Sequence, residues 1–397
     1  MTRHLPRQAG ATLVELMVAL VIGTVIVLAL MIVTSRFESG KRQSGAATDL
    51  SMAAGNIAYD LDRQIRSAGS GYLQSYPQAL GCTLNVSRTG VGQVLPGPAA
   101  FPAPFATVPQ QVRLMPFLIH AGLGNGGSDV LAVMSGTAGV GEVDMPLKPA
   151  GVQSTQLSMM STVGLRRNDM LLLIENNRSC LMTQVGTGFT QSATSSLVPL
   201  GGLYYAASVN GVAVSDYALN DIPSVLNMGN ASDNPPQLTL YGIDGGFNLQ
   251  SYDLLQTNGN QQVSTVLTNI VNMRALYGVD TNGDGKVDLW VKPTTSGYRV
   301  ADLTAGTAVA QSTLANIRAV RIGLILRSDR IEAGASQPVV SASTVKLFSD
   351  LGSTLEYTHT VAAADQYQRF RAVDFTVPLR NALLLPSGSA LTTQVTP

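Results

Sequence analysis

One stretch in the last third of the chain has the residue types and spacing of a calcium-binding loop. In D-T-N-G-D-G-K-V-D, residues 280–288, oxygen-bearing groups occupy loop positions one, three, five, seven and nine. The candidate ligands are Asp280, Asn282, Asp284, the Lys286 carbonyl and Asp288. Position twelve holds Val291 where an EF-hand has a bidentate glutamate, and both flanks read as strands. We therefore expect either a calcium-stapled β-turn or a tight Asn-Gly and Asp-Gly hairpin that needs no metal.

The sequence offers few residues for catalysis. It has three histidines and two cysteines, and His120 and His359 stand alone without a G-x-S-x-G or H-E-x-x-H motif. We expect no catalytic residue and no enzyme activity. The 397 residues carry 25 basic and 25 acidic side chains. This even balance argues against a nucleic-acid partner, which would need a basic face, and the length is ample for a sizeable core.

The N-terminal region holds an apolar run with a single carboxylate. From Ala11 to Thr34 the only charged side chain is Glu15, and the run is about 34 Å long as a helix, enough to cross a bilayer. The leader before it has Arg3 and Arg7 and no acid, so the N-terminus is expected in the cytoplasm and the rest of the chain outside. A carboxylate in mid-membrane costs about 2.5–3.5 kcal/mol on the mildest insertion scale, so Glu15 needs a compensating partner.

The order of basic leader, Gly10 and A-T-L-V-E-L-M-V-A-L resembles the class III signal of type IV prepilins and pseudopilins. The resemblance implies that residues 1–10 are a leader peptide, which prepilin peptidase removes by cutting between Gly10 and Ala11. It also implies N-methylation of Ala11, although most members of the family have Phe where this chain has Ala. The apolar helix is kept after cleavage.

The position of Glu15 has a physical explanation within that resemblance. Cleavage would leave a positive α-amino group at Ala11, and Glu15 lies four residues later on the same helical face. In a filament of packed helices, the carboxylate of one subunit neutralises the amine of its neighbour, where an unpaired charge would be costly. We expect Glu15 to set the assembly register.

Cys82 and Cys180 both lie in the part of the chain expected outside the cytoplasm. An oxidising compartment and an even cysteine count favour a disulfide bond between them. Closing a loop of this length contributes up to about 4–5 kcal/mol by the chain-entropy estimate. The alternative is two buried free cysteines.

The expected fold class is α+β, with a long N-terminal helix packed on a large, mainly antiparallel β head. We expect a membrane-spanning or filament-core helix at 11–34, an amphipathic continuation at 35–68 with a kink near its glycines, and a periplasmic head at 69–397. The continuation has an apolar stripe of Leu50, Ala54, Ile57, Leu61 and Ile65. The proline-rich residues 95–109 are expected to form a surface loop. Strands are expected at 129–134, 169–174, 181–185, 237–243, 317–326 and 371–379, and a helix at 261–276.

Several stretches of the head look like PilW-type minor pilins. They run from L-D-R-Q-I-R-S-A-G-S-G-Y near residue 61 to F-T-V-P-L-R-N near residue 381, whereas 186–235 match nothing recognisable. The resemblance implies a low-abundance subunit that initiates type IV pilus assembly with other minor pilins at the filament tip. The implied partners are other minor pilins, the major pilin, prepilin peptidase/N-methyltransferase, the inner-membrane assembly platform and a large calcium-binding tip adhesin. The implied location is the bacterial inner membrane, then the pilus tip.

Two rival functions share some of these features. A pseudopilin of type II secretion, in particular the J-type tip subunit, has the same leader, helix and β head. A membrane-anchored periplasmic enzyme or binding protein would have an intact leader, and Glu15 would then be incidental. Neighbouring genes separate the first rival from a minor pilin, and the native N-terminus separates the second.

Overall fold

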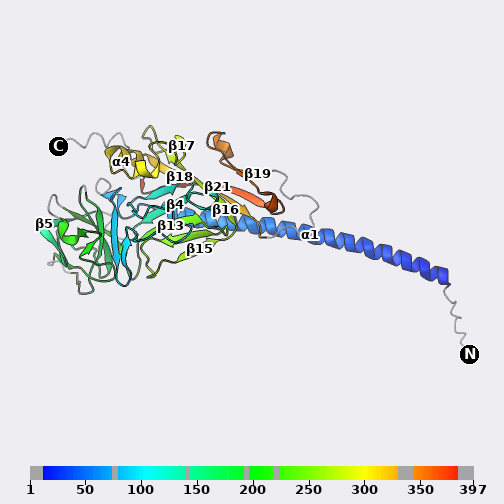
Figure 1. Cartoon of the computed structure of the whole chain (residues 1–397), viewed down its shortest axis with the longest axis horizontal. Helices are drawn as coiled ribbons and strands as arrows, with labels where there is room; N and C mark the ends of the chain where they lie inside the picture. The colour runs from blue at the N-terminus through cyan, green and yellow to red at the C-terminus, as the bar shows by residue number, and fades with distance from the viewer. Residues whose placement is uncertain are drawn as a thin grey trace, which may run out of the picture. The chain divides into compact units, whose positions relative to one another are not determined.

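The computed structural model describes residues 12–73, 79–138, 144–176, 178–191, 196–217, 223–329 and 343–382 (Figure 1). Gly10 and Ala11, the predicted cleavage and methylation site, lie outside these ranges. The chain divides into two compact units, Met1–Met52 and Ala53–Pro397, and helix α1 (Leu13–Arg66) runs through both. With 23% helical and 36% strand residues, the structure confirms the α+β class.

The first unit contains the apolar part of α1. Leu13–Ser35 is a 23-residue segment long and apolar enough to cross a membrane, and none of it is buried within the chain. The Thr24 hydroxyl donates to the Val21 carbonyl at 2.8 Å, and the Thr34 hydroxyl donates to the Leu30 carbonyl at 2.8 Å. These hydroxyl groups are therefore satisfied inside the helix, as an apolar surrounding requires.

The last turns of α1 belong to the second unit and bury one face. The predicted stripe is confirmed here, because Ala54, Ile57, Leu61 and Ile65 are all 3% exposed or less. The helix is continuous, with 54 residues. The backbone is therefore helical at Gly40, Gly45 and Gly55, and the kink expected near these glycines stays a prediction.

The chain leaves α1 at a tightly bonded corner. Gly69 has a positive φ of 82°, and its N–H donates to the Met134 carbonyl at 2.8 Å. The same carbonyl accepts from the Tyr72 hydroxyl at 3.0 Å. The side-chain amide of Asn381, which is more than 300 residues later in the sequence, donates to the carbonyls of Ser67 and Ala68. The end of the helix is thus held by residues that are remote in sequence.

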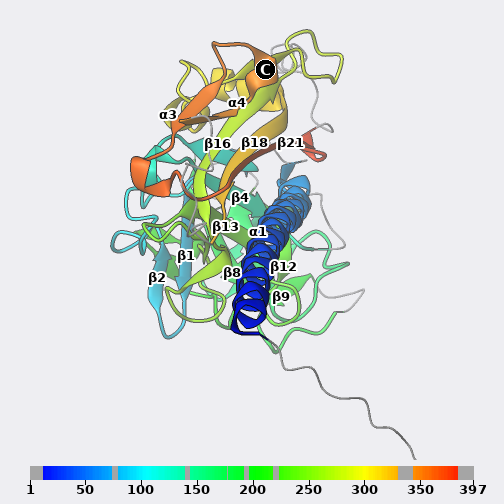
Figure 2. The same ribbon diagram turned by 90° about the vertical axis from the view of Figure 1, so that its right-hand side faces the viewer.

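Three sheets make up most of the head. The eight-stranded sheet has the order β2 (Gly92–Leu95), β1 (Leu84–Arg88), β8 (Cys180–Gln184), β7 (Asp169–Ile174), β12 (Ser224–Asn230), β5 (Met145–Gln153), β6 (Gln156–Met159) and β9 (Leu197–Pro199). The five-stranded sheet has the order β15 (Val263–Leu267), β14 (Leu249–Asp253), β13 (Gln237–Ile243), β4 (Val130–Ser135) and β3 (Phe117–His120). The four-stranded sheet has the order β17 (Leu289–Val291), β16 (Ile270–Val279), β18 (Ile317–Arg327) and β21 (Phe370–Pro378). Figure 2 shows β16, β18 and β21 side by side.

Shorter elements complete the described part of the head. Two hairpins pair β10 (Ser208–Val209) with β11 (Val212–Ala213) and β19 (Thr344–Leu347) with β20 (Tyr357–Thr360). Helices α3 (Val300–Leu303) and α4 (Ala308–Ala315) join the third sheet's strands. Single 3-10 turns occupy Asn125–Gly127, Val214–Asp216, Ser349–Leu351 and Ala363–Asp365. Among the named strand pairs, β1 and β8 are parallel and the others are antiparallel.

The core of the eight-stranded sheet is built from cross-strand rows of aliphatic side chains. In one such row Leu173 of β7 stands between Val225 of β12 and Leu181 of β8, and all three are fully buried. Burying a side chain of this size contributes about 1.5–3 kcal/mol relative to leaving it in water. The six predicted strands are all present, within a residue or two of the expected bounds.

The prediction of a helix at 261–276 is wrong. This stretch forms β15 and the start of β16, separated by Asn269 at a positive φ of 63°. Val263 and Val266 are β-branched and favour an extended backbone. Their spacing resembled a helical stripe only because the apolar positions of two strands were read as one element.

The proline-rich loop has no strand or helix beyond Leu95, as expected, but it is more than a surface connection. Phe105 is fully buried and Phe101 is 5% exposed. Both rings contact Tyr252 of β14, with centroid separations of 6.1 and 5.7 Å. The loop is therefore anchored to the five-stranded sheet by its aromatic side chains.

Candidate functional site

Glu15 lies at the start of α1, where it takes part in a reciprocal cap. The Glu15 N–H donates to the Thr12 hydroxyl oxygen at 3.3 Å, and the Thr12 N–H donates to Glu15 Oε2 at 3.4 Å. This is the capping-box arrangement, in which a Thr and a Glu three residues later satisfy each other's backbone donors. The T-L-V-E spacing is the signal for it, which the sequence-based interpretation missed. In the single chain, Glu15 therefore stabilises its own helix, and its side chain is exposed.

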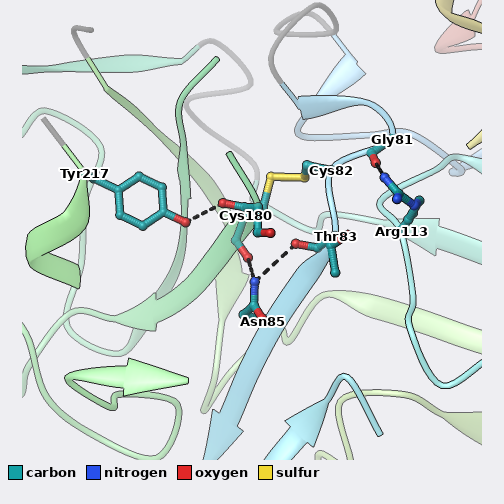
Figure 3. The surroundings of a disulfide bond; sticks show 8 residues. Gly81, Cys82, Thr83, Asn85, Arg113, Cys180 and Tyr217 are labelled. Carbon is teal, nitrogen blue, oxygen red and sulfur yellow. Dashed lines mark hydrogen bonds between the residues drawn. A yellow bond between two sulfur atoms is a disulfide. The ribbon is translucent and has the colours of Figure 1, made fainter. Parts of the chain in front are cut away.

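The two cysteines form the predicted disulfide bond. Cys82 and Cys180 are bonded, with their Cα atoms 5.6 Å apart, and the described residues include no free cysteine. The alternative of two free thiols is thus excluded. Figure 3 shows this disulfide bond. It lies where the parallel pairing of β1 and β8 begins, with Leu84 of β1 in register with Cys180 of β8.

Polar side chains secure both ends of this bridge. The Asn85 amide donates to the carbonyls of Thr83 and Cys180, and the Arg113 guanidinium donates to the Gly81 carbonyl at 2.8 Å. The bridge therefore joins the first strand of the head to a strand almost a hundred residues later.

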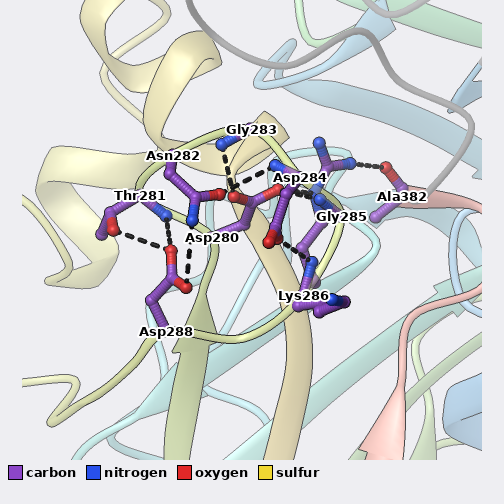
Figure 4. Close-up of polar contacts among 10 residues, drawn as sticks. Asp280, Thr281, Asn282, Gly283, Asp284, Gly285, Lys286, Asp288 and Ala382 are labelled. Atoms are coloured by element: carbon purple, nitrogen blue, oxygen red, sulfur yellow. Dashed lines mark hydrogen bonds and ion pairs between the residues drawn. The ribbon is translucent and has the colours of Figure 1, made fainter.

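The loop at 280–288 closes on itself (Figure 4). Asp280 Oδ1 accepts from the Gly283 N–H at 2.6 Å, and Asp280 Oδ2 accepts from the Gly285 N–H at 2.9 Å. Asp288 accepts from both the N–H and the hydroxyl of Thr281, each at 2.8 Å. Within the loop, Asn282 accepts from the Asp284 N–H at 2.9 Å and Asp284 accepts from the Lys286 N–H at 2.8 Å, which are the bonds of two consecutive Asx turns.

A buried arginine completes this loop in place of a cation. Arg318 Nε lies 3.3 Å from Asp280 Oδ2, and both residues are less than 5% exposed. Burial alone would raise the pKa of Asp280, but the N–H groups of Gly285 and Gly283 and the guanidinium hold that pKa below its ordinary value. The Arg318 partnership was missed, although an arginine inside the apolar strand I-R-A-V-R-I-G-L-I-L was the available signal.

The predicted ligands do not form a cation cage in this conformation. Both oxygens of Asp280 face hydrogen-bond donors. The searched part of the chain holds no group of three or more His, Cys, Asp or Glu side chains able to bind a metal ion. The loop is closed by its own bonds, and the calcium-stapled turn and the metal-free hairpin expected from the sequence both stay predictions.

The histidines are apart, as the sequence suggested. His120 ends β3 of the five-stranded sheet, and His359 lies in the β19–β20 hairpin. Burial lowers the pKa of both, that of His120 to about 4.

Comparisons with known proteins add two matches. Residues 228–381 match the family model of type IV pilus-assembly protein W, PilW, and residues 5–31 match the prokaryotic N-terminal methylation motif. No curated protein and no solved structure matches the chain. The first match covers β13 to β21, and the second covers the apolar start of α1 with Glu15. Together the two matches support a type IV pilin-like protein involved in pilus assembly, with its similarity to PilW in residues 228–381.

Proposed function

We propose that this protein takes part in initiating type IV pilus assembly as a processed subunit of a tip or priming complex. The observation that carries the proposal is the presence on one chain of the N-terminal methylation motif and a PilW-type region in the head. The methylation motif supports the proposal that the chain is cut after Gly10 and then leaves the membrane. The family of the second match is named for its role in type IV pilus assembly.

The proposed route begins with cleavage after Gly10 and methylation of Ala11 by prepilin peptidase. The helix then moves sideways from the membrane into a bundle of other pilin helices. Its exposed apolar surface from Leu13 to Ser35, which the single chain leaves uncovered, would be buried against those helices. In this bundle Glu15 pairs with the terminal amine of a neighbour and sets the register.

The proposed topology follows from the same segment. The N-terminus lies in the cytoplasm, α1 crosses the inner membrane and the head folds in the periplasm before it reaches the pilus tip. The Cys82–Cys180 bond supports this location, because disulfides form in the periplasm and are rare in the cytosol. The proposed partners are other minor pilins, the major pilin and the inner-membrane assembly platform, together with a large tip adhesin.

The capping box makes a sharp test of Glu15 possible. Glu15→Gln keeps an acceptor that can complete the box with Thr12, but it removes the charge. Glu15→Ala removes both, and Thr12→Ala breaks the box while leaving the charge. We expect both Glu15 variants to be cleaved after Gly10 and to abolish surface pili, whereas Thr12→Ala assembles pili.

The readouts are mass spectrometry of the native N-terminus and counts of surface pili in a strain that lacks the chromosomal copy. Normal piliation with Glu15→Gln would show that the charge does not set the register. An intact Met1 in cells with active prepilin peptidase would refute the whole proposal and favour a simple membrane anchor.

A type II secretion pseudopilin remains the second candidate, because the methylation motif at 5–31 is shared by both classes. The PilW match in the head favours the pilus. Deleting the gene separates the two: loss of pili with normal protein secretion supports the proposal, and loss of secretion with normal pili supports the rival.

A further inference from the structure

The five-stranded sheet carries a cavity that plays no part in the proposed assembly. Its volume is about 650 Å³, which is within the range of sites for small molecules. Its floor is a cross-strand row in which Ala132 of β4 stands between Leu118 of β3 and Leu240 of β13. The small alanine between two leucines leaves the hollow.

The walls come from two segments that are far apart in sequence. One is the end of the proline-rich loop with the residues after it, 107–113, and the other runs from Pro293 to Thr304 and includes α3. The exposed residues Thr107, Thr294 and Ala301 form part of the lining, so the cavity is reached from solvent. The lining is mainly apolar and would bind the hydrocarbon part of a ligand.

Two arginines supply the charge of this cavity. Arg113 donates from Nη1 to the Gly81 carbonyl, and Arg299 donates from Nε to the Thr294 carbonyl at 3.0 Å. Neither forms an ion pair with an acidic side chain in the described ranges, and no Asp or Glu lines the cavity. The remaining guanidinium N–H groups suit a carboxylate, which accepts charge-assisted hydrogen bonds.

A buried imidazole also lines the cavity. His120 is 8% exposed, and within the described ranges its ring has no hydrogen-bond partner. Burial lowers its pKa to about 4, so at neutral pH the ring is uncharged and offers one donor and one acceptor. A ligand with a polar end would find both a donor and an acceptor on this ring.

We propose that this cavity is a binding site for a small apolar molecule that carries one carboxylate. The hydrocarbon part lies on the Leu118–Ala132–Leu240 row, and the carboxylate bonds to Arg113 and Arg299, with His120 as an additional polar contact. This site does not depend on the proposed role in pilus assembly, because all of these residues lie in the head.

The test uses the full-length protein in detergent and two probes of equal size, 4-phenylbutyrate and the uncharged 4-phenylbutan-1-ol. Isothermal titration calorimetry measures both, with detergent alone as the blank. We expect the carboxylate to bind at least about tenfold more tightly than the alcohol, since a hydrogen bond to a charged group contributes about 1.5–3 kcal/mol. Arg113→Gln combined with Arg299→Gln should remove this preference, and His120→Leu should weaken the carboxylate alone.

A matched pair of alanine variants controls for the location. Ala301 is exposed and lines the cavity, so Ala301→Trp should block both probes. Ala305 is exposed four residues later and does not line it, so Ala305→Trp should bind both normally. Equal affinity of the wild-type protein for acid and alcohol would overturn the proposal. Unchanged binding by Ala301→Trp, in a variant with a wild-type unfolding curve, would also overturn it.

Discussion

Arg318 on β18 and Asp280 at the end of β16 form a buried ion pair, with Nε 3.3 Å from Oδ2. The pair holds the 280–288 loop against the four-stranded sheet. The same guanidinium donates from Nη1 to the carbonyl of Ala382 at 2.5 Å. One side chain therefore ties together a turn, a central strand and the segment that follows the last strand.

Removing one partner of this pair should destabilise the head strongly. Arg318→Met would leave the Asp280 carboxylate buried without its cation, which costs about 3–5 kcal/mol. Asp280→Asn combined with Arg318→Met should cost less, because no unpaired charge remains. Denaturant unfolding of the two variants measures the difference. Equal losses would mean that the charge of Asp280 is compensated by its backbone donors alone.

Calcium should have little effect on stability in the folded state described here. Asp280 already accepts from two N–H groups and Arg318, and Asp288 accepts from Thr281. We expect the thermal midpoint to be the same in excess EGTA and in calcium. Asp284→Ala provides the control, since this side chain is an exposed candidate ligand and its bond to the Lys286 N–H is the one it makes within the described residues. A midpoint that rises with calcium and loses this response in Asp284→Ala would establish the metal site predicted from the sequence.

Loss of the disulfide bond should lower the free energy of unfolding of the head substantially. The bond closes a loop with a sequence separation of 98 residues, for which the chain-entropy estimate gives about 4–5 kcal/mol. Replacing both Cys82 and Cys180 by Ser should lower the free energy of unfolding by about this amount. The wild-type protein after reduction should behave in the same way. Denaturant titration with and without reductant provides the comparison, and a loss below about 1 kcal/mol would contradict the expectation.

The head should lose stability as the pH falls from 6.5 to 4. Burial lowers the pKa of His120 from 6.5 to about 4, so in this range the unfolded chain binds more protons than the folded one. The contribution of His120 to stability is full above pH 6.5 and falls by about 3 kcal/mol by pH 4.

A His120→Gln variant should lose much of this dependence on pH. His359→Gln is the matched control, because burial also lowers the pKa of His359 but its side chain is less buried than that of His120. Free energies of unfolding measured at pH 7, 5.5 and 4.5 test this. An equal slope in the wild-type and His120→Gln proteins would show that the pKa of His120 is the same in the folded and unfolded states.

Local patterns predicted the regular elements well. The apolar stripe from Ala54 to Ile65 has the helical period. The sequences of β7 and β18 are short, mainly aliphatic runs, which are typical of strands buried on both faces, and both strands are buried in this way. At 261–276 the period was misleading, because a turn at Asn269 joins two strands whose apolar positions happen to align. Positive φ at an asparagine is a property of the tertiary fold more than of the local pattern.

Contacts between distant residues were the part that the sequence could not supply. The cysteine pairing was accessible because there were only two candidates. In contrast, Arg318 faces Asp280 only after β16 and β18 pair, and the hollow over Ala132 exists only because β3, β4 and β13 align that residue with two leucines. Register decides both features, and register is set by the whole sheet.

The corner at Gly69 gives the head a particular response to mechanical load. A pull along α1 reaches Met134 on β4 through two hydrogen bonds, and reaches Asn381 beyond β21 through two more. The tension is thus divided between two sheets at the point where the helix ends. Separating the end of the helix from either sheet therefore requires breaking hydrogen bonds to it, so the two sheets share the load.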